Sequence, residues 1–211
     1  RPLSKLTHHL IVNKMSELQH YLDQLIKPSR VYTREECLER NGPVPKKPGV
    51  YAWYFKETPP MVPLDNCVDH DGLSLLYIGI SPSKPPRRGK SSSQNLSKRI
   101  KYHYRGNAEG STLRLILGCL LSDTLDIELR RVGSGNRMTF HTGEDRLSDW
   151  MSENAFVTWV THPEPWKLED YAIKQLSLPL NLRDNEKHLF HRKLTSLRRQ
   201  CKRNARSSSI K

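Results

Sequence analysis

The spacing of hydrophobic and polar positions predicts that the chain begins with helices. Residues 15–26 repeat apolar side chains at helical spacing, and Pro28 ends the pattern, whereas the first dozen residues show no clear pattern. Thr33 and Glu36 have the spacing of a capping box, which predicts a second, short helix. A connector with three prolines, residues 43–48, separates these helices from the next part of the chain.

The pattern then changes to that of strands. Residues 49–55 (GVYAWYF) and 73–80 (LSLLYIGI) are rich in aromatic and branched side chains and predict two strands. Residues 56–72, with several prolines and acidic side chains, predict an inserted loop between them. A loop of proline, basic and serine residues follows at 82–93, and residues 95–104 predict a helix.

The second half of the chain predicts mainly helices. In order, we expect a helix over 112–121 capped by Ser111, a strand over 125–132, a helix through 151 capped by Thr142 with Asp145, a strand over 155–161, a helix over 165–176 and a last helix from about residue 186. Early antiparallel strands followed by helices indicate an α+β fold and not an alternating parallel sheet.

Composition excludes several classes of protein. The chain has 211 residues, of which 36% are hydrophobic, and no apolar run approaches the roughly 20 residues of a membrane span. Its four cysteines are scattered and lack the paired spacing of a metal or disulfide framework. We therefore expect no membrane partner, reduced thiols and a cytoplasmic location.

The net charge of +13 is concentrated in two segments. Residues 84–105 contain eight basic and no acidic side chains, and residues 183–211 carry a net charge of +8, so the rest of the chain is slightly acidic. Two basic blocks on a nearly neutral body are typical of a surface that binds a phosphate backbone. From Arg198 onward, a frayed basic tail is an equally good interpretation.

Several residues that could carry chemistry have an ordinary structural interpretation when each is considered alone. Tyr51 and Tyr77 lie in apolar strands, where tyrosines are usually part of the core. Arg99 and His103 are four residues apart and share one helix face. Glu169 could be a favourable charge near a helix start. No single one of them is diagnostic.

Together these residues form an ordered set of motifs. The set is Gly49-Val50-Tyr51, Tyr77-Ile78-Gly79, Asn95 to Arg99 with His103, then Glu169 and Asn181. In this order the chain resembles the GIY-YIG nuclease superfamily over residues 48–181, and other segments are similar to uncharacterised bacterial members. The 25 residues between Tyr51 and Tyr77 make this interval longer than in compact members.

The resemblance implies a fold and a reaction. The fold would be a small antiparallel sheet flanked by helices, and the activity would be that of a DNA endonuclease that hydrolyses phosphodiester bonds with one divalent cation, Mg²⁺ or Mn²⁺. Glu169 would be the metal ligand. Arg99 would stabilise the negative charge of the transition state. Tyr51, with Tyr77 or His103 beside it, would help to deprotonate the attacking water, which requires surroundings that lower the pKa of Tyr51.

The remaining residues of the motifs have supporting roles in this interpretation. Gly49 and Gly79 would permit close packing, and Asn181 would hold a loop or orient another side chain. The residues expected to bind nucleic acid are all basic: Lys84, Arg87, Arg88, Lys90, Lys98, Lys101, Arg198 and Arg199.

Alternatives remain at the level of function. A catalytically silent DNA-binding module on the same fold is a rival hypothesis, and charge alone does not distinguish DNA from RNA as the partner. A single site cuts one strand, so double-strand cleavage would need a homodimer or two successive events. Sequence specificity and physiological role do not follow from the sequence.

The predicted elements divide the chain into three parts. Residues 1–42 would be a helical N-terminal extension packed on the rest, residues 43–185 the nuclease domain, and residues 186–211 a basic C-terminal helix and tail.

Overall fold

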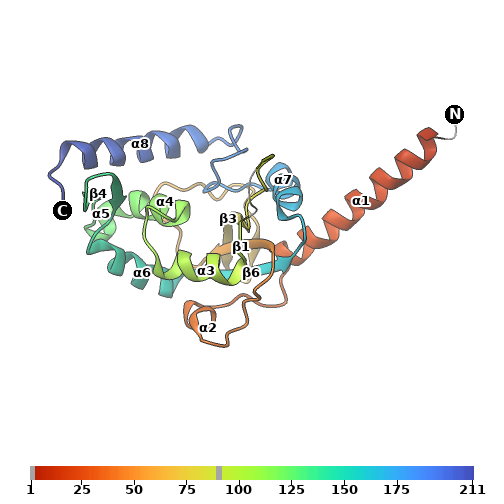
Figure 1. Cartoon of the computed structure of the whole chain (residues 1–211), viewed down its shortest axis with the longest axis horizontal. Coiled ribbons are helices and arrows are strands. Elements are labelled where there is room, and N and C mark those ends of the chain that lie inside the picture. Colours follow the sequence, from red (N-terminus) through yellow and green to blue (C-terminus); the bar gives the residue numbers. More distant parts are fainter. Residues whose placement is uncertain (1–2, 89–91) are drawn as a thin grey trace.

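The computed structural model of the protein describes residues 3–88 and 92–211, and for residues 3–13 it describes the backbone only. The described chain has the predicted α+β fold, with a four-stranded antiparallel sheet among helices (Figure 1). The helices are α1 (Leu3–Ile26), α2 (Arg34–Leu38), α3 (Leu96–Arg105), α4 (Thr112–Leu120), α5 (Ser122–Leu125), α6 (Gly143–Asn154), α7 (Pro165–Gln175) and α8 (His191–Ser207). The strands are β1 (Gly49–Phe55), β2 (Asp69–His70), β3 (Leu73–Ser81), β4 (Arg130–Val132), β5 (Arg137–Thr139) and β6 (Ala155–Thr161).

Strand β1 lies inside the main sheet, whose strand order is β2-β3-β1-β6. All seven residues of β1 are buried, because helices cover both faces of the sheet. Tyr51, Trp53 and Phe55 pack into a core shared with α3, α4 and α6. Val50 and Ala52 face the opposite way and pack with α1 and α7. Burial on both faces explains why this segment is continuously apolar instead of alternating.

The two motif strands lie side by side. β1 and β3 are antiparallel, with Tyr51 opposite Gly79 and Trp53 opposite Tyr77. A Cβ atom on Gly79 would lie only 2.5 Å from the Tyr51 hydroxyl oxygen, so the absence of a side chain there makes room for the tyrosine ring. At the start of β1, a Cβ on Gly49 would lie 2.2 Å from the backbone oxygen of Val160. Both glycines therefore permit close packing around the motif strands.

The predicted strand over residues 125–132 is wrong for most of its length. Ser122–Leu125 is a short helix, Asp126 ends it with a φ of +49°, and only Arg130–Val132 is a strand, paired with β5. Ile127 and Leu129 are buried in the core. The alternating pattern in this segment therefore records side-chain burial and not the pairing of backbone groups along its whole length.

Three helix ends differ from the prediction. α1 begins at Leu3, well before the apolar repeat, and α8 begins at His191 instead of near residue 186. Before α8, Asn185 is buried and its side chain donates to the backbone oxygens of Leu178 and Asn181, which holds the chain in turns there. Thr142 precedes α6 but its side chain makes no capping hydrogen bond.

The C-terminal half of α1 packs on the sheet, while its other half projects from the body of the molecule (Figure 1). Leu22 and Leu25 are buried beneath β6 and α7. The Tyr54 hydroxyl donates to the backbone oxygen of Leu25 at 2.7 Å, and the Tyr171 hydroxyl donates to Gln19 Oε1 at 2.6 Å. No helix of the described residues is both long and apolar enough to span a membrane.

The basic C-terminal segment is docked on the fold and not frayed. α8 packs on α4 and β4. Beyond the helix, the backbone N–H of Lys211 donates to the backbone oxygen of Arg131 at 2.9 Å, and the Arg131 side chain donates to the backbone oxygens of Ala205 and Ser208. These bonds place α8 along one side of the molecule, next to α4 (Figure 1).

Candidate active site

A cleft of about 310 Å³ opens where the two motif strands meet α3, α4, α7 and α8. It is lined by residues of all of these elements and of the loops after β3 and α7: Tyr51, Tyr77, Gly79, Ile80, Ser83, Arg99, Thr112, Glu169, Asn181, Leu182, Arg183, Asp184 and Arg198. The described residues thus bring most of the predicted catalytic side chains to one place. His103 is the exception, because it is fully buried behind Tyr51.

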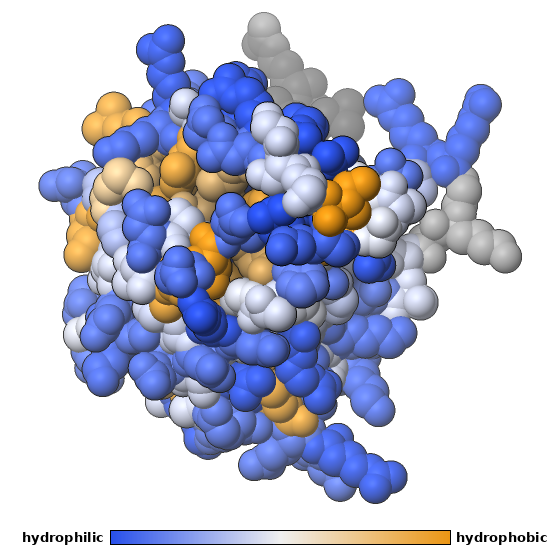
Figure 2. All heavy atoms as spheres, turned by 90° about the vertical axis from the view of Figure 1, so that its left-hand side faces the viewer, coloured by the Kyte–Doolittle hydropathy of each residue, from blue (hydrophilic) through white to orange (hydrophobic). Residues whose placement is uncertain are grey.

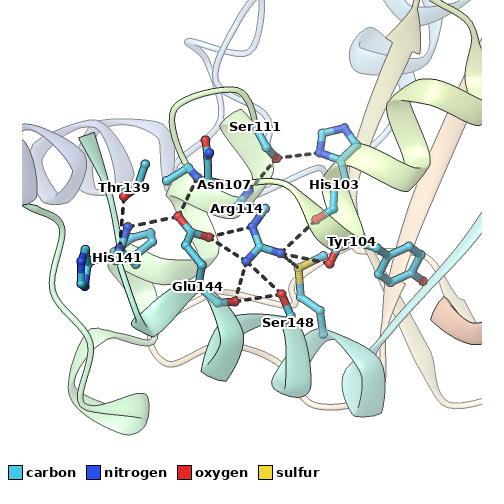
Figure 3. A network of polar contacts seen from close by, with 12 residues as sticks. His103, Tyr104, Asn107, Ser111, Arg114, Thr139, His141, Glu144 and Ser148 are labelled. Carbon is cyan, nitrogen blue, oxygen red and sulfur yellow. Dashed lines mark hydrogen bonds and ion pairs between the residues drawn. The ribbon is translucent and has the colours of Figure 1, made fainter. Parts of the chain in front are cut away.

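A chain of hydrogen bonds runs from the cleft into the core. The Tyr51 hydroxyl and His103 Nε2 are 2.8 Å apart, and His103 Nδ1 lies 2.7 Å from Ser111 Oγ (Figure 3 shows the second of these bonds). Ser111 Oγ also accepts the backbone N–H of Arg114 as the cap of α4. Ser111, which caps α4, therefore also positions the His103 imidazole that bonds to Tyr51.

A buried ion pair supports this chain from behind. The Arg114 guanidinium is fully buried and donates twice to Glu144 Oε2, from Nε at 2.9 Å and from Nη2 at 2.7 Å (Figure 3). Its Nη1 donates to the backbone oxygens of His103 and Tyr104 at the end of α3. Arg114 thereby joins α4, α3 and α6 around the histidine.

The electrostatic environment keeps the tyrosines protonated. Burial raises the pKa of Tyr51 to about 12, and the nearby Arg99 offsets only part of that rise. Burial also raises the pKa of Tyr77. The expectation that the surroundings lower the pKa of Tyr51 is therefore wrong for the protein alone, because loss of hydration disfavours the phenolate more than the cation favours it.

His103 is neutral at physiological pH. Burial, together with the cations of Arg99 and Arg114, lowers its pKa well below the usual range. A neutral imidazole has one nitrogen that donates and one that accepts. His103 can therefore accept the Tyr51 proton at Nε2 while its Nδ1–H donates to Ser111 Oγ.

Arg99 reaches the cleft from the face of α3 that also carries His103. Its Nη1 donates to the backbone oxygen of Gly110 at 2.9 Å, which anchors the guanidinium group. No carboxylate of the described residues forms an ion pair with it. Its remaining N–H groups lie beside the Tyr51 hydroxyl and can also donate to an anion in the cleft.

Glu169 supplies a carboxylate in the cleft. Burial raises its pKa to about 7, Arg183 lowers it, and Asp170 and Asp184 raise it. Among the described residues, no hydrogen bond contributes to stabilising its charged form. A partly buried carboxylate without a donor is suited to hold a hard cation, which would replace its lost hydration.

Asn181 fixes the loop after α7, which carries Arg183 and Asp184. Its Oδ1 accepts the backbone N–H of Ile78, and its Nδ2 donates to the backbone oxygen of the same residue, both at 2.9 Å. β2 has only two residues, so it leaves this part of the β3 edge open. The asparagine side chain occupies that edge and brings Arg183 and Asp184 to the cleft.

The residues predicted to bind nucleic acid are not all near the cleft. Arg198 lines it, whereas Arg199 is exposed and does not. Lys98 Nζ donates to the backbone oxygen of Ser93, and Lys101 Nζ donates to that of Glu39, near the end of α2. The exposed residues Lys84, Arg87 and Arg88 lie in the loop after β3, and Lys90 lies outside the described residues.

The structure adds residues that the sequence analysis did not assign to the site. Asp184 and Arg183 line the cleft, and Ser111, Arg114 and Glu144 support His103. A sequence signal existed for two of them. Ser111 has the position of a helix cap, and Arg114 is a charged residue inside an apolar helix, which is uncommon unless it is paired. Nothing local distinguishes Asp184 or Glu144.

A metal ion would need ligands from outside the protein. In the parts of the chain that the structure describes, no three His, Cys, Asp or Glu side chains lie close enough together to bind one. A site with one carboxylate, completed by water and substrate oxygens, is compatible with this arrangement.

Comparison with known proteins gives one match. A family model described as the GIY-YIG catalytic domain matches residues 49–200, which includes the strands, the cleft and the first part of α8. The comparisons with curated proteins and with solved structures found no match.

Proposed function

The chain belongs to the GIY-YIG catalytic-domain family, whose members are generally nucleases, and we propose that it is a metal-dependent endonuclease that hydrolyses phosphodiester bonds in DNA. One observation carries the proposal. Tyr51, Tyr77, Arg99 and Glu169, which are widely separated in the sequence, line one cleft, and a neutral His103 bonds to Tyr51 from behind. These groups can activate water, stabilise a phosphate and bind a cation.

Glu169 would hold the divalent cation, Mg²⁺ or Mn²⁺. When bound, such an ion neutralises negative charge on the phosphate and favours the loss of a proton from water. The pKa of about 7 indicates that, without a cation, the Glu169 side chain is charged in about half of the molecules near neutral pH. Because only the charged form binds the ion, binding would release a proton and become tighter as the pH rises.

Tyr51 and His103 would remove the proton of the attacking water. The Tyr51 oxygen takes that proton while the Tyr51 hydroxyl proton passes to His103 Nε2 over the 2.8 Å hydrogen bond. This relay requires no stable phenolate, which agrees with the raised pKa of Tyr51. The product is an imidazolium between two arginines, so it would be short-lived and favoured by the negative charge of the phosphate in the cleft.

Arg99 and Tyr77 would act on the phosphate. The Gly110 bond holds the Arg99 guanidinium in place, and its remaining donors can meet the charge that develops on the phosphate oxygens. Tyr77 is protonated and lies in the cleft, where its hydroxyl can donate to the substrate or orient the water. Gly49, Gly79 and Asn181 would have positioning roles.

DNA binding would involve the basic residues outside the cleft. Lys84, Arg87 and Arg88 follow β3 closely enough to contact a strand that enters the cleft. Lys98, Lys101 and Arg199 lie outside the cleft lining and would contact more distant phosphates. The division of the chain at residues 42 and 185 also stays a proposal. The family match extends to residue 200, so α8 would then work together with the nuclease domain.

Nicking of a supercoiled plasmid tests the proposed activity. Wild-type protein should produce nicked circles with Mg²⁺ and none with a chelator, because one cleft cuts one strand at a time. Glu169→Gln should slow nicking by at least ~10²-fold, the usual cost of losing a transition-state contact, while binding to the same DNA stays near wild type. Glu153→Gln is the matched control, because it makes the same chemical change at an exposed residue of α6 that lies outside the cleft and is not among the charges that shift the pKa of Glu169.

The rival functions give different results in the same assays. A catalytically silent DNA-binding module would bind the plasmid and not nick it, nor cut linear, single-stranded or branched DNA, at any concentration of Mg²⁺ or Mn²⁺. An RNA-directed protein would be displaced from DNA by RNA at equal phosphate concentration. Full nicking by Glu169→Gln would contradict the role of Glu169 as the metal ligand.

A further inference from the structure

We propose that Arg198, Lys202 and Arg206 of α8 form a phosphate-binding row that continues the catalytic cleft and holds one strand of DNA for about three to four nucleotides beyond the cleavage site. The proposal rests on the proposed function, because it assigns a path to the same substrate. It concerns binding only, and it can therefore be tested without cleavage.

α8 is an amphipathic helix with one apolar side and much basic surface. Its 17 residues include seven Lys or Arg and no Asp or Glu. Leu194 and Ala205 are buried, and Leu197 and Cys201 pack against the same core. These four residues define the side that docks on α4. The basic residues lie on the rest of the helix surface.

Arg198, Lys202 and Arg206 are spaced by four and share one helix face, next to the docked side. All three line a second hollow of about 300 Å³ between α8 and the segments around α4 and β5. Arg198 and Thr112 line both this hollow and the catalytic cleft. The two hollows therefore adjoin, and the row leads away from the proposed site of cleavage.

The charges along this path are suited to an anion. In the described structure none of the three basic side chains takes part in an ion pair, and Arg198 Nε is buried without a hydrogen-bond partner. One carboxylate, Glu109, also lines the second hollow, but it is exposed and accepts the backbone N–H of Met138. The three side chains of the row therefore carry a net positive charge, and one of them, the partly buried Arg198, has no ion-pair partner among the described residues. A phosphate would stabilise this arrangement.

The dimensions also fit a nucleic-acid strand. Eight residues of helix separate Arg198 from Arg206, a rise of about 12 Å. One DNA strand carries a charge about every 3.4 Å along the helix axis, so this distance covers about three to four phosphates. Figure 2 shows hydrophilic residues over most of the face at the C-terminal end of α8 and hydrophobic ones only in small separate patches. Such a surface suits a charged polymer better than an apolar protein partner.

The test compares two triple variants of the full chain. Arg198→Ala, Lys202→Ala and Arg206→Ala remove the row. Arg192→Ala, Lys193→Ala and Arg203→Ala remove the same charge from exposed positions of α8 that line neither hollow. Binding of a fluorescent duplex and of a single-stranded oligonucleotide is measured by anisotropy at several salt concentrations, with a chelator present to prevent cleavage.

The row variant should lower the salt slope by up to ~2.7 on duplex and ~2.1 on single-stranded DNA, corresponding to three lost phosphate contacts. The control variant should lower it by less than ~0.9, the value of one contact. Equal losses in the two variants would overturn the proposal, since they would show a diffuse charge effect, and so would an unchanged slope in the row variant. Tighter binding of an RNA of the same sequence would overturn the choice of DNA.

Two further measurements keep the result interpretable. Circular dichroism and thermal unfolding of both variants must match wild type. If the row variant fails to fold, Arg206→Ala is compared with Arg203→Ala, because both side chains are exposed.

Absence of nicking by wild-type protein, with the binding difference intact, would defeat the proposed nuclease function and leave the row as a DNA-binding surface. Nicking without the binding difference would defeat the row alone.

Discussion

The hydroxyl of Tyr51 is held in place by residues of two other elements, β3 and α3. Gly79 leaves room for the ring, His103 Nε2 bonds to the oxygen, and burial raises the pKa of Tyr51 to about 12. A tyrosine held in this way is a poor free base but a good link in a proton chain, since its hydroxyl can give and accept a proton at the same time. The chemistry of the site thus depends on a pair of side chains and not on one ionised residue.

Arg99→Lys tests whether the guanidinium has a role beyond its charge. Lysine keeps the charge but loses the planar fork and the anchored geometry at Gly110, so the cleavage rate on saturating DNA should fall by ~10²-fold or more. Single-turnover rates measure the effect. Lys98→Ala is the control, because its side chain bonds to the backbone of Ser93 on another side of α3, and it should weaken binding mildly. Equal losses in both variants would show that Arg99 is only another phosphate contact.

Glu169 makes the stability of the metal-free protein dependent on pH. Folding raises the pKa of Glu169 from 4.5 to about 7. The stability that the protonated group contributes is therefore fully present below about pH 4.5 and is lost as the pH rises through about 7. Glu169→Gln removes the ionisation and keeps the shape. We therefore compare the two proteins in a chelating buffer. The melting temperature of the variant minus that of wild type should be larger at pH 8 than at pH 5. The same difference at both pH values would contradict the raised pKa.

Helix α4 organises the back of the site. Ser111 caps it and contacts the histidine, and Arg114, one turn later, contacts the end of α3 and the start of α6. Glu144 Oε1 also accepts the backbone N–H groups of Ala108 and Phe140, so one carboxylate ties two loops to α6. The geometry of the Tyr51–His103 pair is consequently a property of three packed helices.

Arg114→Met measures how much this buried ion pair stabilises the fold. The substitution leaves the Glu144 carboxylate without its guanidinium in a largely buried position, and it should cost about 3–5 kcal/mol of unfolding free energy, as removal of one partner of a buried pair typically does. Urea unfolding measures this loss. Arg146→Met breaks an exposed pair with Asp126 and should have a much smaller effect. Similar losses in both variants would show that the Arg114 pair is no stronger than a surface contact.

The cleft depends on the fold as a unit, because the elements that line it come from separated parts of the chain. The sheet supplies the two tyrosines, α3 and α7 supply the arginine and the carboxylate from different sides, and α8 closes one side with Arg198. The buried ion pair and the Asn181 bonds hold these parts at fixed positions. Loss of any one contact therefore affects groups that are distant in sequence but adjacent in space.

The sequence by itself determined the strands β1, β3 and β6, most of the helices and the family, but not the short strands β2, which lies in the predicted loop, and β5. GVYAWYF and LSLLYIGI predicted β1 and β3, Ser111 predicted the cap of α4, and the ordered motifs indicated the catalytic-domain family that the family model matches. These features are local, because propensity, periodicity and capping depend on residues within a few positions of one another. The strand predicted over 125–132 was wrong for the same reason, since an alternating pattern does not specify a pairing partner.

Only the tertiary structure decided which side chains meet and in which state of protonation. It placed Arg198 in the same cleft as Glu169, directed Lys101 away from the cleft towards α2, and brought Glu144 to Arg114 across 30 residues. It also reversed the expected direction of the Tyr51 pKa, because burial depends on every helix packed around the ring. Contacts, desolvation and charge coupling arise between residues that are far apart along the chain, so no local pattern in the sequence encodes them.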